Sequence, residues 1–362
     1  MKSKTIILTV TVLLIAATLN ATVWRVNNRA NMDADFTTLQ EAIDGANSGD
    51  TLYIEGSAVA YGNGTFDKKL VVIGTGFWLE ENDTTQSFKQ KAQVGKLIFN
   101  DGSQGSVIQG LYLYHTSSSG FNIIEINTDS VTIERNYIYG YESGQNTQNG
   151  NSVFIAANTS DIIIRYNWIK AVINDNYHNI HDGNAIGIYI AGIPESIIIK
   201  SNFIRAYKTN GPGGFYAIYF ATNNPDNELM LSSNVMWGGI RTFYTNHYDN
   251  ILVSGTYNNG TGDESFNNLC DATQYPNSNN NQQNVDMSTV FVDYDSYIDN
   301  GYKLTSGSPA TGAAMNGGDC GAFGEDPYIL SGMPSIPAMF ETTVIPYGTT
   351  SLPVNIKAVS HN

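Results

Sequence analysis

The sequence predicts an all-β solenoid in which short parallel strands stack coil upon coil along one axis. A short pattern centred on Asn returns four times, and each copy follows a strand-like segment with apolar residues at alternate positions. The composition agrees, since 14% of residues are charged and 22 are Tyr, which favours strands with polar turns. No crossover helix fits between these strands, so a doubly wound α/β sheet is excluded.

The repeated pattern places one Asn between an alternating strand and a second, shorter strand. The four Asn residues lie 31, 35 and 32 positions apart, and Gly110 occupies the same position 26 residues before the first of them. The copies span 131–139, 162–170, 197–205 and 229–237, with Asn136, Asn167, Asn202 and Asn234 at their centres. The strands ahead of them span 123–127, 153–157, 186–191 and 217–221.

One set of three short strands cannot bury its own inner face. Stacking equivalent sets about 4.8 Å apart solves this problem and produces a solenoid. The repeated Asn residues then stack as well, and each side-chain amide bonds to its neighbours above and below. The sequence therefore predicts an asparagine ladder that runs along the solenoid.

The two ends of the chain predict caps and three regions. Residues 36–46 form an amphipathic helix with Thr37 or Thr38 as its N-cap, placed to cover the first coil. An Asn-rich surface loop is expected at 257–290, then a last coil with strands near 290–293 and 302–304. The regions are a leader at 1–21, the solenoid at 22–325 and a tail at 326–362 that folds back as a carboxy-terminal β cap.

The first 21 residues predict a secretory signal, with Lys2 and Lys4 ahead of an apolar run. Removing these two lysines changes the formal net charge from −15 to −17, which disfavours binding to nucleic acid or anionic membranes. No later segment is apolar enough to span a membrane. We expect a secreted, periplasmic or cell-surface monomer.

Only two cysteines occur, Cys270 and Cys320. In an exported protein they can form a disulfide, or they can remain buried as free thiols. The sequence leaves both arrangements open.

The capping helix, the Gly49-Asp50 turn that follows it and the asparagine ladder carry a resemblance to a known family. Over residues 23–325 the chain resembles the pectate-lyase-like (pectin-lyase-like) superfamily of right-handed parallel β-helix proteins. The resemblance implies the fold, but the superfamily includes lyases, hydrolases, adhesins and scaffolds. Asn127-Thr128-Asp129 matches one pectinase motif, and the other pectinase and pectate-lyase signatures are absent, so no catalytic residue is carried over.

Two rows of outward side chains are candidate binding surfaces, because equivalent positions of stacked coils lie side by side. The first row, Glu125, Phe154, Tyr189 and Tyr219, predicts an aromatic platform for sugar rings. The alternative is that these aromatic residues pack beneath long loops. The second row, Tyr139, Lys170, Arg205 and Trp237, combines aromatic rings with cations, which suits a sugar that carries carboxylates or hydroxyls. The alternative is an ordinary solvated face.

The loop at 174–184 is the segment whose side chains are best suited to metal binding or catalysis. Asp175 and Asp182 could bind Ca²⁺ through carboxylate oxygens, and His178 or His181 could act as a base. Alternatively, the two acids form a hydrolytic pair, or the loop is a polar turn without a function of its own.

Two classes of function follow from these residues. In the first, the protein binds extracellular polysaccharide and cleaves it as a lyase or glycosidase. A lyase would neutralise the sugar carboxylate with Ca²⁺ or Arg205 and remove a ring proton with His181 or Lys170. In the second, it is a non-catalytic glycan-binding, adhesive or structural β-helix at the cell surface.

Overall fold

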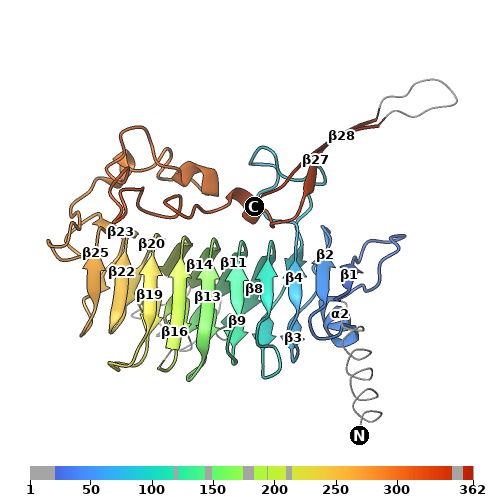
Figure 1. The fold of residues 1–362 in the computed structure, drawn as a ribbon, viewed down its shortest axis with the longest axis horizontal. Coiled ribbons are helices and arrows are strands. Elements are labelled where there is room, and N and C mark those ends of the chain that lie inside the picture. The colour runs from blue at the N-terminus through green and yellow to red at the C-terminus, as the bar shows by residue number, and fades with distance from the viewer. Residues whose placement is uncertain are drawn as a thin grey trace, which may run out of the picture.

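The computed structural model describes residues 21–117, 121–142, 149–173, 183–193, 195–208, 214–344 and 354–361. Its body is a parallel β-helix, in which three sheets run along a common axis (Figure 1). Between residues 51 and 270, strands that follow one another in the chain belong to different sheets, and each pairs in parallel with the equivalent strand of the next coil. The predicted all-β solenoid is confirmed.

Most coils contribute one strand to each of the three sheets. Sheet A contains β1 (Val23–Val26), β2 (Thr51–Ile54), β4 (Val71–Ile73), β7 (Val107–Gln109), β10 (Thr132–Glu134), β13 (Ser160–Arg165), β16 (Glu195–Lys200), β19 (Leu229–Ser232), β22 (Thr245–Tyr248) and β25 (Glu264–Phe266). Sheet B contains β3 (Gly64–Phe66), β6 (Leu97–Phe99), β9 (Phe121–Ile126), β12 (Gly150–Ile155), β15 (Ala185–Ile190), β18 (Phe215–Phe220), β21 (Gly239–Arg241) and β24 (Tyr257–Asn258). Sheet C contains β5 (Gln93–Val94), β8 (Tyr112–Ser117), β11 (Tyr137–Glu142), β14 (Trp168–Ile173), β17 (Phe203–Lys208), β20 (Val235–Trp237), β23 (Ile251–Ser254) and β26 (Leu269–Cys270).

The inward residues of the strands form rows of aliphatic side chains. In sheet A, register places Ile133, Ile164, Ile199 and Leu231 in one fully buried row. Burial of such a side chain contributes about 1.5–3 kcal/mol. The strict period of two within each strand therefore fixes which residues remain outside.

The asparagine ladder lies at the bend between sheets A and C. The Oδ1 atom of Asn202 accepts hydrogen bonds from the backbone N–H of Asn167 at 2.9 Å and from its Nδ2 at 3.1 Å. The Nδ2 atom of Asn202 donates to the carbonyls of Ile164 and Lys200. Asn136, Asn167, Asn202 and Asn234 are all fully buried, so the predicted ladder is confirmed.

The ladder is longer than the sequence pattern indicated. Asn250, Asn268 and Asn281 continue it at spacings of 16, 18 and 13 residues. The prediction of a surface loop over 257–290 was therefore wrong in its first part, because β24, β25 and β26 lie there. At the other end, Gly110 pairs with Arg135, and Leu111 occupies the ladder position, one residue later than predicted.

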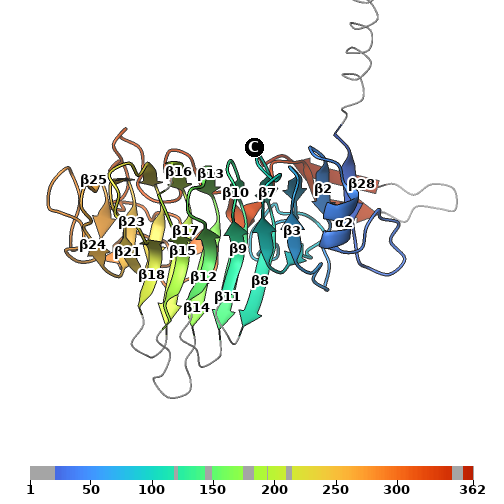
Figure 2. The ribbon, with the colours of Figure 1, turned by 90° about the horizontal axis from the view of Figure 1, so that it is seen from below.

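Two long sheet extensions create a thin projection, which we call the fin. Beyond the body, the ends of β8, β11, β14 and β17 pack face to face against the starts of β9, β12, β15 and β18 (Figure 2). The two layers lie close, and a Cβ atom added at Gly140 would lie 2.1 Å from the ring of Phe121. Gly140 is therefore required by the close approach of the layers.

The amino-terminal cap is the helix α2 (Leu39–Gly45). Thr38 is its N-cap and forms a capping box with Glu41, as one of the two predicted alternatives. Leu39, Ala42 and Ile43 are buried on the first coils. Among the described residues, no helix is long and apolar enough to cross a membrane.

After β26 the chain turns back along the outside of the helix (Figure 1). The last coil is covered by residues 271–290, where Tyr275 is buried against His247 and Tyr257. Residues 291–335, here called the C-terminal segment, then cover part of the outer face of sheet C. Phe291 and Leu304, expected in a last coil, form an isolated antiparallel bridge there.

The predicted capping tail, 326–362, begins beside β16, where Asp326 pairs with Lys200, and its residues 333–339 lie beside the early coils rather than across the last one. Its Met333 carbonyl accepts a hydrogen bond from Arg135, and its Met339 carbonyl accepts one from Ser87. The tail ends in the antiparallel hairpin β27 (Ala338–Val344) and β28 (Val354–Val359).

Cys270 and Cys320 are free, buried thiols. Burial raises the pKa of both thiols, and each lies within hydrogen-bond range of a backbone carbonyl. Of the two arrangements that the sequence left open, the structure has the unpaired one.

Replacing Asn202 with Ala should lower the free energy of unfolding by about 2–4 kcal/mol, because it leaves the backbone N–H of Asn167 without its acceptor and removes the donor to the carbonyls of Ile164 and Lys200. The measurement is the midpoint of urea unfolding. Asn158→Gly is the control, since Asn158 is exposed and its φ of 61° suits Gly. Equal midpoints for the two variants would contradict a stabilising ladder.

Candidate functional site

The outer face of sheet C brings the second predicted row together. Strand register aligns Tyr114, Tyr139, Lys170, Arg205 and Trp237 on five successive strands, which we call the sheet C row. The strand pairing therefore contains the predicted alignment of Tyr139, Lys170, Arg205 and Trp237. Tyr114 was not predicted, because no Asn marks its coil.

The Tyr114 and Tyr139 rings of this row each lie beside a second Tyr ring on the same strand, Tyr112 and Tyr137, and are only partly buried. Tyr114, Tyr139, Lys170 and Arg205 are all half-buried. The rings of Tyr114 and Tyr139 are inclined by 51° to each other rather than stacked in parallel. Trp237 differs, because it is only 8% exposed and packs edge-on against Tyr302 of the C-terminal segment.

Lys170 and Arg205 have no carboxylate partner in the part of the chain that the structure describes. The Lys170 Nζ atom lies 4.8 Å from the centre of the Tyr139 ring, and the Arg205 Cζ atom lies 5.9 Å from that of Trp237. Burial, reinforced by the charge of Arg205, lowers the pKa of Lys170. Two adjacent half-buried cations without a carboxylate partner among the described residues can pair with an anionic ligand.

Two hollows border the sheet C row. The first, of about 470 Å³, lies at its β8 end and is lined by Trp78, Lys91 and Tyr112 among others. There the Nζ atom of Lys91 lies 3.2 Å from the centre of the Tyr112 ring, and burial raises the pKa of Tyr112 to about 12. The second hollow, of about 540 Å³, lies at the Arg205 end.

The first predicted row lies on sheet B. Glu125, Phe154, Tyr189 and Tyr219 pair in one row, as predicted. The centres of the Phe154 and Tyr189 rings lie 5.5 Å apart at 7°, and those of Tyr189 and Tyr219 lie 5.4 Å apart at 6°. We call these three rings the sheet B stack.

The faces of the rings in the sheet B stack lie against one another. Arg241 lies over Tyr219 at one end, and Glu125 at the other end is paired with Lys96 at 2.9 Å. Sugar rings stack on aromatic faces, and this arrangement presents mainly ring edges. The geometry therefore favours a stabilising role for the stack over the predicted sugar platform.

Asp175, His178, His181 and Asp182 lie outside the described residues. The predicted Ca²⁺ site and histidine base therefore remain predictions. Within the described ranges, no group of three or more His, Cys, Asp or Glu side chains is placed to hold a metal ion.

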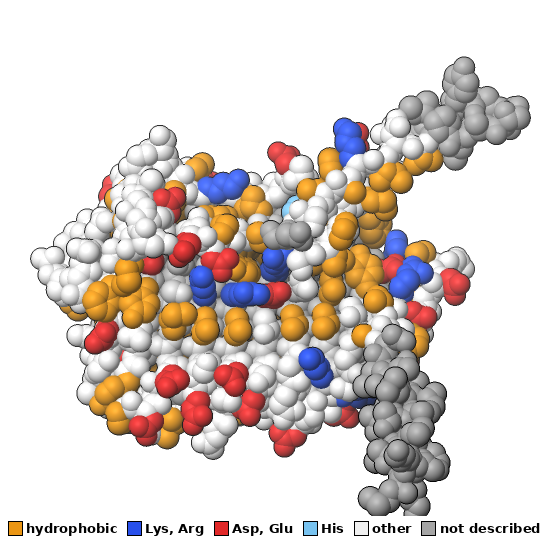
Figure 3. All heavy atoms as spheres, in the orientation of Figure 1, with side chains coloured by type: hydrophobic (Ala, Val, Ile, Leu, Met, Phe, Trp, Pro, Cys, Tyr) orange, Lys and Arg blue, Asp and Glu red, His pale blue; other side chains and the backbone are white. Residues whose placement is uncertain are grey.

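Two cations on the face of sheet A are paired with carboxylates. Figure 3 shows a row of hydrophobic side chains across this face, with Lys and Arg beside it. Arg165 pairs with Glu134 at 2.7 Å and Lys200 with Asp326 at 3.1 Å. These cations supply matched controls for Lys170 and Arg205 of sheet C.

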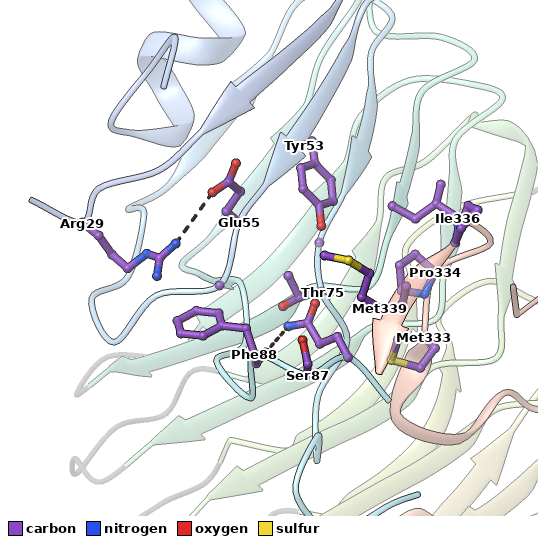
Figure 4. A pocket seen from close by; sticks show the side chains of 15 residues that line it. Arg29, Tyr53, Glu55, Thr75, Ser87, Phe88, Met333, Pro334, Ile336 and Met339 are labelled. Carbon is purple, nitrogen blue, oxygen red and sulfur yellow. Dashed lines mark hydrogen bonds and ion pairs between the residues drawn. The ribbon is translucent and has the colours of Figure 1, made fainter. Parts of the chain in front are cut away.

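A pocket of about 410 Å³ lies between the early coils and the C-terminal tail (Figure 4). Its Arg29 lies over the ring of Phe88 and within 3.8 Å of Glu55, which also pairs with Arg25. Its apolar wall comes from Met333, Met339 and neighbouring prolines. With its cation already matched, this pocket offers less to an anionic ligand than sheet C does.

Several residues of the sheet C face escaped the sequence analysis. Tyr207 lies two positions after Arg205 on the same strand, so the period of two could have revealed it. Tyr294 and Tyr297 line the second hollow from the C-terminal segment, and no repeat pattern marks them.

Comparison of the sequence with known proteins gives no match for this chain. No protein-family model matches the chain, and no curated protein matches its sequence.

Replacing Tyr189 with Ala should lower the free energy of unfolding by about 1–3 kcal/mol, because it removes two parallel ring contacts. Urea unfolding measures this loss. Binding to polysaccharides should not change, and a loss of binding without a loss of stability would restore the sugar-platform interpretation.

Proposed function

We propose that this chain is an exported, pectate-lyase-like β-helix protein that binds an acidic polysaccharide along the outer face of sheet C. The observation that carries the proposal is the pair of half-buried cations Lys170 and Arg205, which lie beside aromatic rings and have no carboxylate partner among the described residues. Neighbouring positions in a sheet lie about 4.8 Å apart, so an extended chain can meet several of these side chains at once.

The aromatic members of the row support a sugar ligand. Tyr114 and Tyr139 offer tilted, half-exposed rings against which a sugar can pack. Carboxylates on the same sugar would accept charge-assisted hydrogen bonds from Arg205 and Lys170. The row therefore combines the two contacts that an acidic sugar needs.

A lyase reaction is the enzymatic form of this proposal. Arg205 would neutralise the carboxylate of a uronic acid, and Lys170, whose pKa is lowered by burial, would accept the proton beside that carboxylate. The bond to the leaving sugar oxygen then breaks, a double bond forms in the ring, and the oxygen takes up a proton. Hydrolysis is less well supported, since the sheet C row itself holds no carboxylate.

Non-catalytic binding is the second candidate function. The missing lyase and pectinase signatures in the sequence favour it, and the same sheet C row would carry it. The two candidates therefore differ in product formation and not in the binding surface.

Replacing Lys170 and Arg205 with Gln should weaken binding to acidic polysaccharides by about 10- to 100-fold per residue, because each substitution removes a charge-assisted contact. Affinity electrophoresis through gels containing polygalacturonate, alginate or neutral dextran measures this change. Lys200→Gln and Arg165→Gln, which alter paired cations on sheet A, are matched controls. Equal retention by dextran, or equal losses in the control variants, would contradict the proposal.

If the protein is a lyase, the wild-type chain should release unsaturated uronic ends that absorb in the ultraviolet. Lys170→Gln should then lower kcat by at least about 100-fold, the contribution typical of a general base. Arg205→Gln should raise KM as well, since it also removes a ligand contact. Retention of acidic polysaccharide without such products would reject the lyase and leave the binding function.

A further inference from the structure

The second hollow of sheet C lies at a step in the β-helix. Ladder spacing falls from 32 residues before Asn234 to 16 after it, so the coils suddenly become shorter. Strand β17 has six residues, whereas β20 has three, and the fin therefore ends at β17 and β18. Tyr207 and Phe215 stand at this edge and are 49% and 45% exposed.

The C-terminal segment closes the opposite side of the step. Tyr294 and Tyr297 belong to this segment, and Tyr297 is 84% exposed. Together with Arg205 and Trp237 from the sheet, these residues line a hollow of about 540 Å³, here called the step pocket. This volume lies within the roughly 300–1,000 Å³ typical of small-ligand sites.

The four aromatic side chains at the rim of the step pocket are exposed, at 49% for Tyr207, 45% for Phe215, 38% for Tyr294 and 84% for Tyr297. Tyr207, Phe215, Tyr294 and Tyr297 make no contact with another aromatic ring among the described residues, unlike the rings of the sheet B stack. Such exposure of four large aromatic side chains around one hollow is unfavourable in water, unless a ligand covers them.

The polar groups of the step pocket are also available. Arg205 contributes a guanidinium group with no hydrogen-bond partner among the described residues, and Asp295 adds an exposed carboxylate at the rim. Exposed aromatic rings beside a donor and an acceptor fit a sugar ring, whose C–H face is apolar and whose hydroxyl groups are polar.

The sheet C row does not continue evenly past the step. Trp237 pairs with Ser254 through a register shift, and the C-terminal segment lies over this region. A glycan that extends along Tyr139, Lys170 and Arg205 is therefore blocked by the C-terminal segment at the step pocket. We propose that the step pocket binds the terminal sugar ring of a glycan chain, so that the protein recognises chain ends. This proposal rests on the proposed function and adds the end-specificity.

The test compares long polygalacturonate with oligomers prepared from it, at equal mass, as competitors for retention of the full mature protein on immobilised polygalacturonate. Oligomers about tenfold shorter carry about ten times more ends, so they should compete about tenfold better per unit mass. Tyr207→Ala and Tyr297→Ala should each weaken competition by oligomers several-fold, up to about tenfold.

The controls separate this proposal from the proposed function. Both tyrosines are largely exposed, so thermal unfolding should confirm that the variants fold, and Tyr189→Ala should leave competition unchanged. If long chains compete as well as oligomers per unit mass while Lys170→Gln still abolishes retention, end recognition fails and the polysaccharide proposal stands. If no acidic polysaccharide is retained, both fail.

Discussion

The bend between sheets A and C is the constraint on which the rest of the structure depends. At each bend one residue adopts a left-handed conformation, and the non-Gly examples are Arg135, Tyr166, Ser201, Ser233, Asp249, Asn267 and Asn280. Such residues cost about 1–2 kcal/mol each, and the turn also points backbone N–H groups along the helix axis. The ladder Asn that follows each of these residues accepts two hydrogen bonds from the coil before it and donates to carbonyls. These bonds offset the cost of the left-handed conformation and give an N–H group of the turn its acceptor. An Ala or Ser at the same position could not make all of these bonds.

The ladder also determines where function can lie, because it fixes the register of every coil at one point. From that point each strand presents equivalent residues at equivalent heights, so Tyr139, Lys170 and Arg205 must form a row. What remains variable is the length of chain between successive ladder residues. Spacings of 25 to 35 residues build the fin, and spacings of 16 and 18 build the short coils beyond it. The step pocket lies where these two regimes meet.

The sequence predicted the solenoid, the ladder and both outward rows, because all three depend on local periodicity. It could not predict ring orientation, which decides that Phe154, Tyr189 and Tyr219 stack face to face whereas Tyr114 and Tyr139 are tilted. Side-chain orientation depends on which neighbour fills the adjacent space, and periodicity does not contain that information.

The burial of Trp237 was likewise beyond a repeat analysis. Tyr302 covers it from a segment 65 residues later in the chain that has no pattern of its own. The last ladder residues were missed for a different reason. Asn250 and Asn268 follow the same bend, but their spacing is half that of the earlier copies, so a search at a fixed period passes over them. A search for the bend itself would have found them.

The charge of the protein sets opposing conditions on an anionic ligand. A formal net charge of −15 repels a polyanion at long range, whereas Lys170 and Arg205 attract it only at close range. At physiological ionic strength the screening length is about 8 Å, so the distant repulsion is largely removed. Contacts to the two half-buried cations are screened less, because protein replaces much of the solvent around them. Very low salt should therefore restore the repulsion and high salt should weaken the contacts, and binding to sheet C would be strongest between these limits.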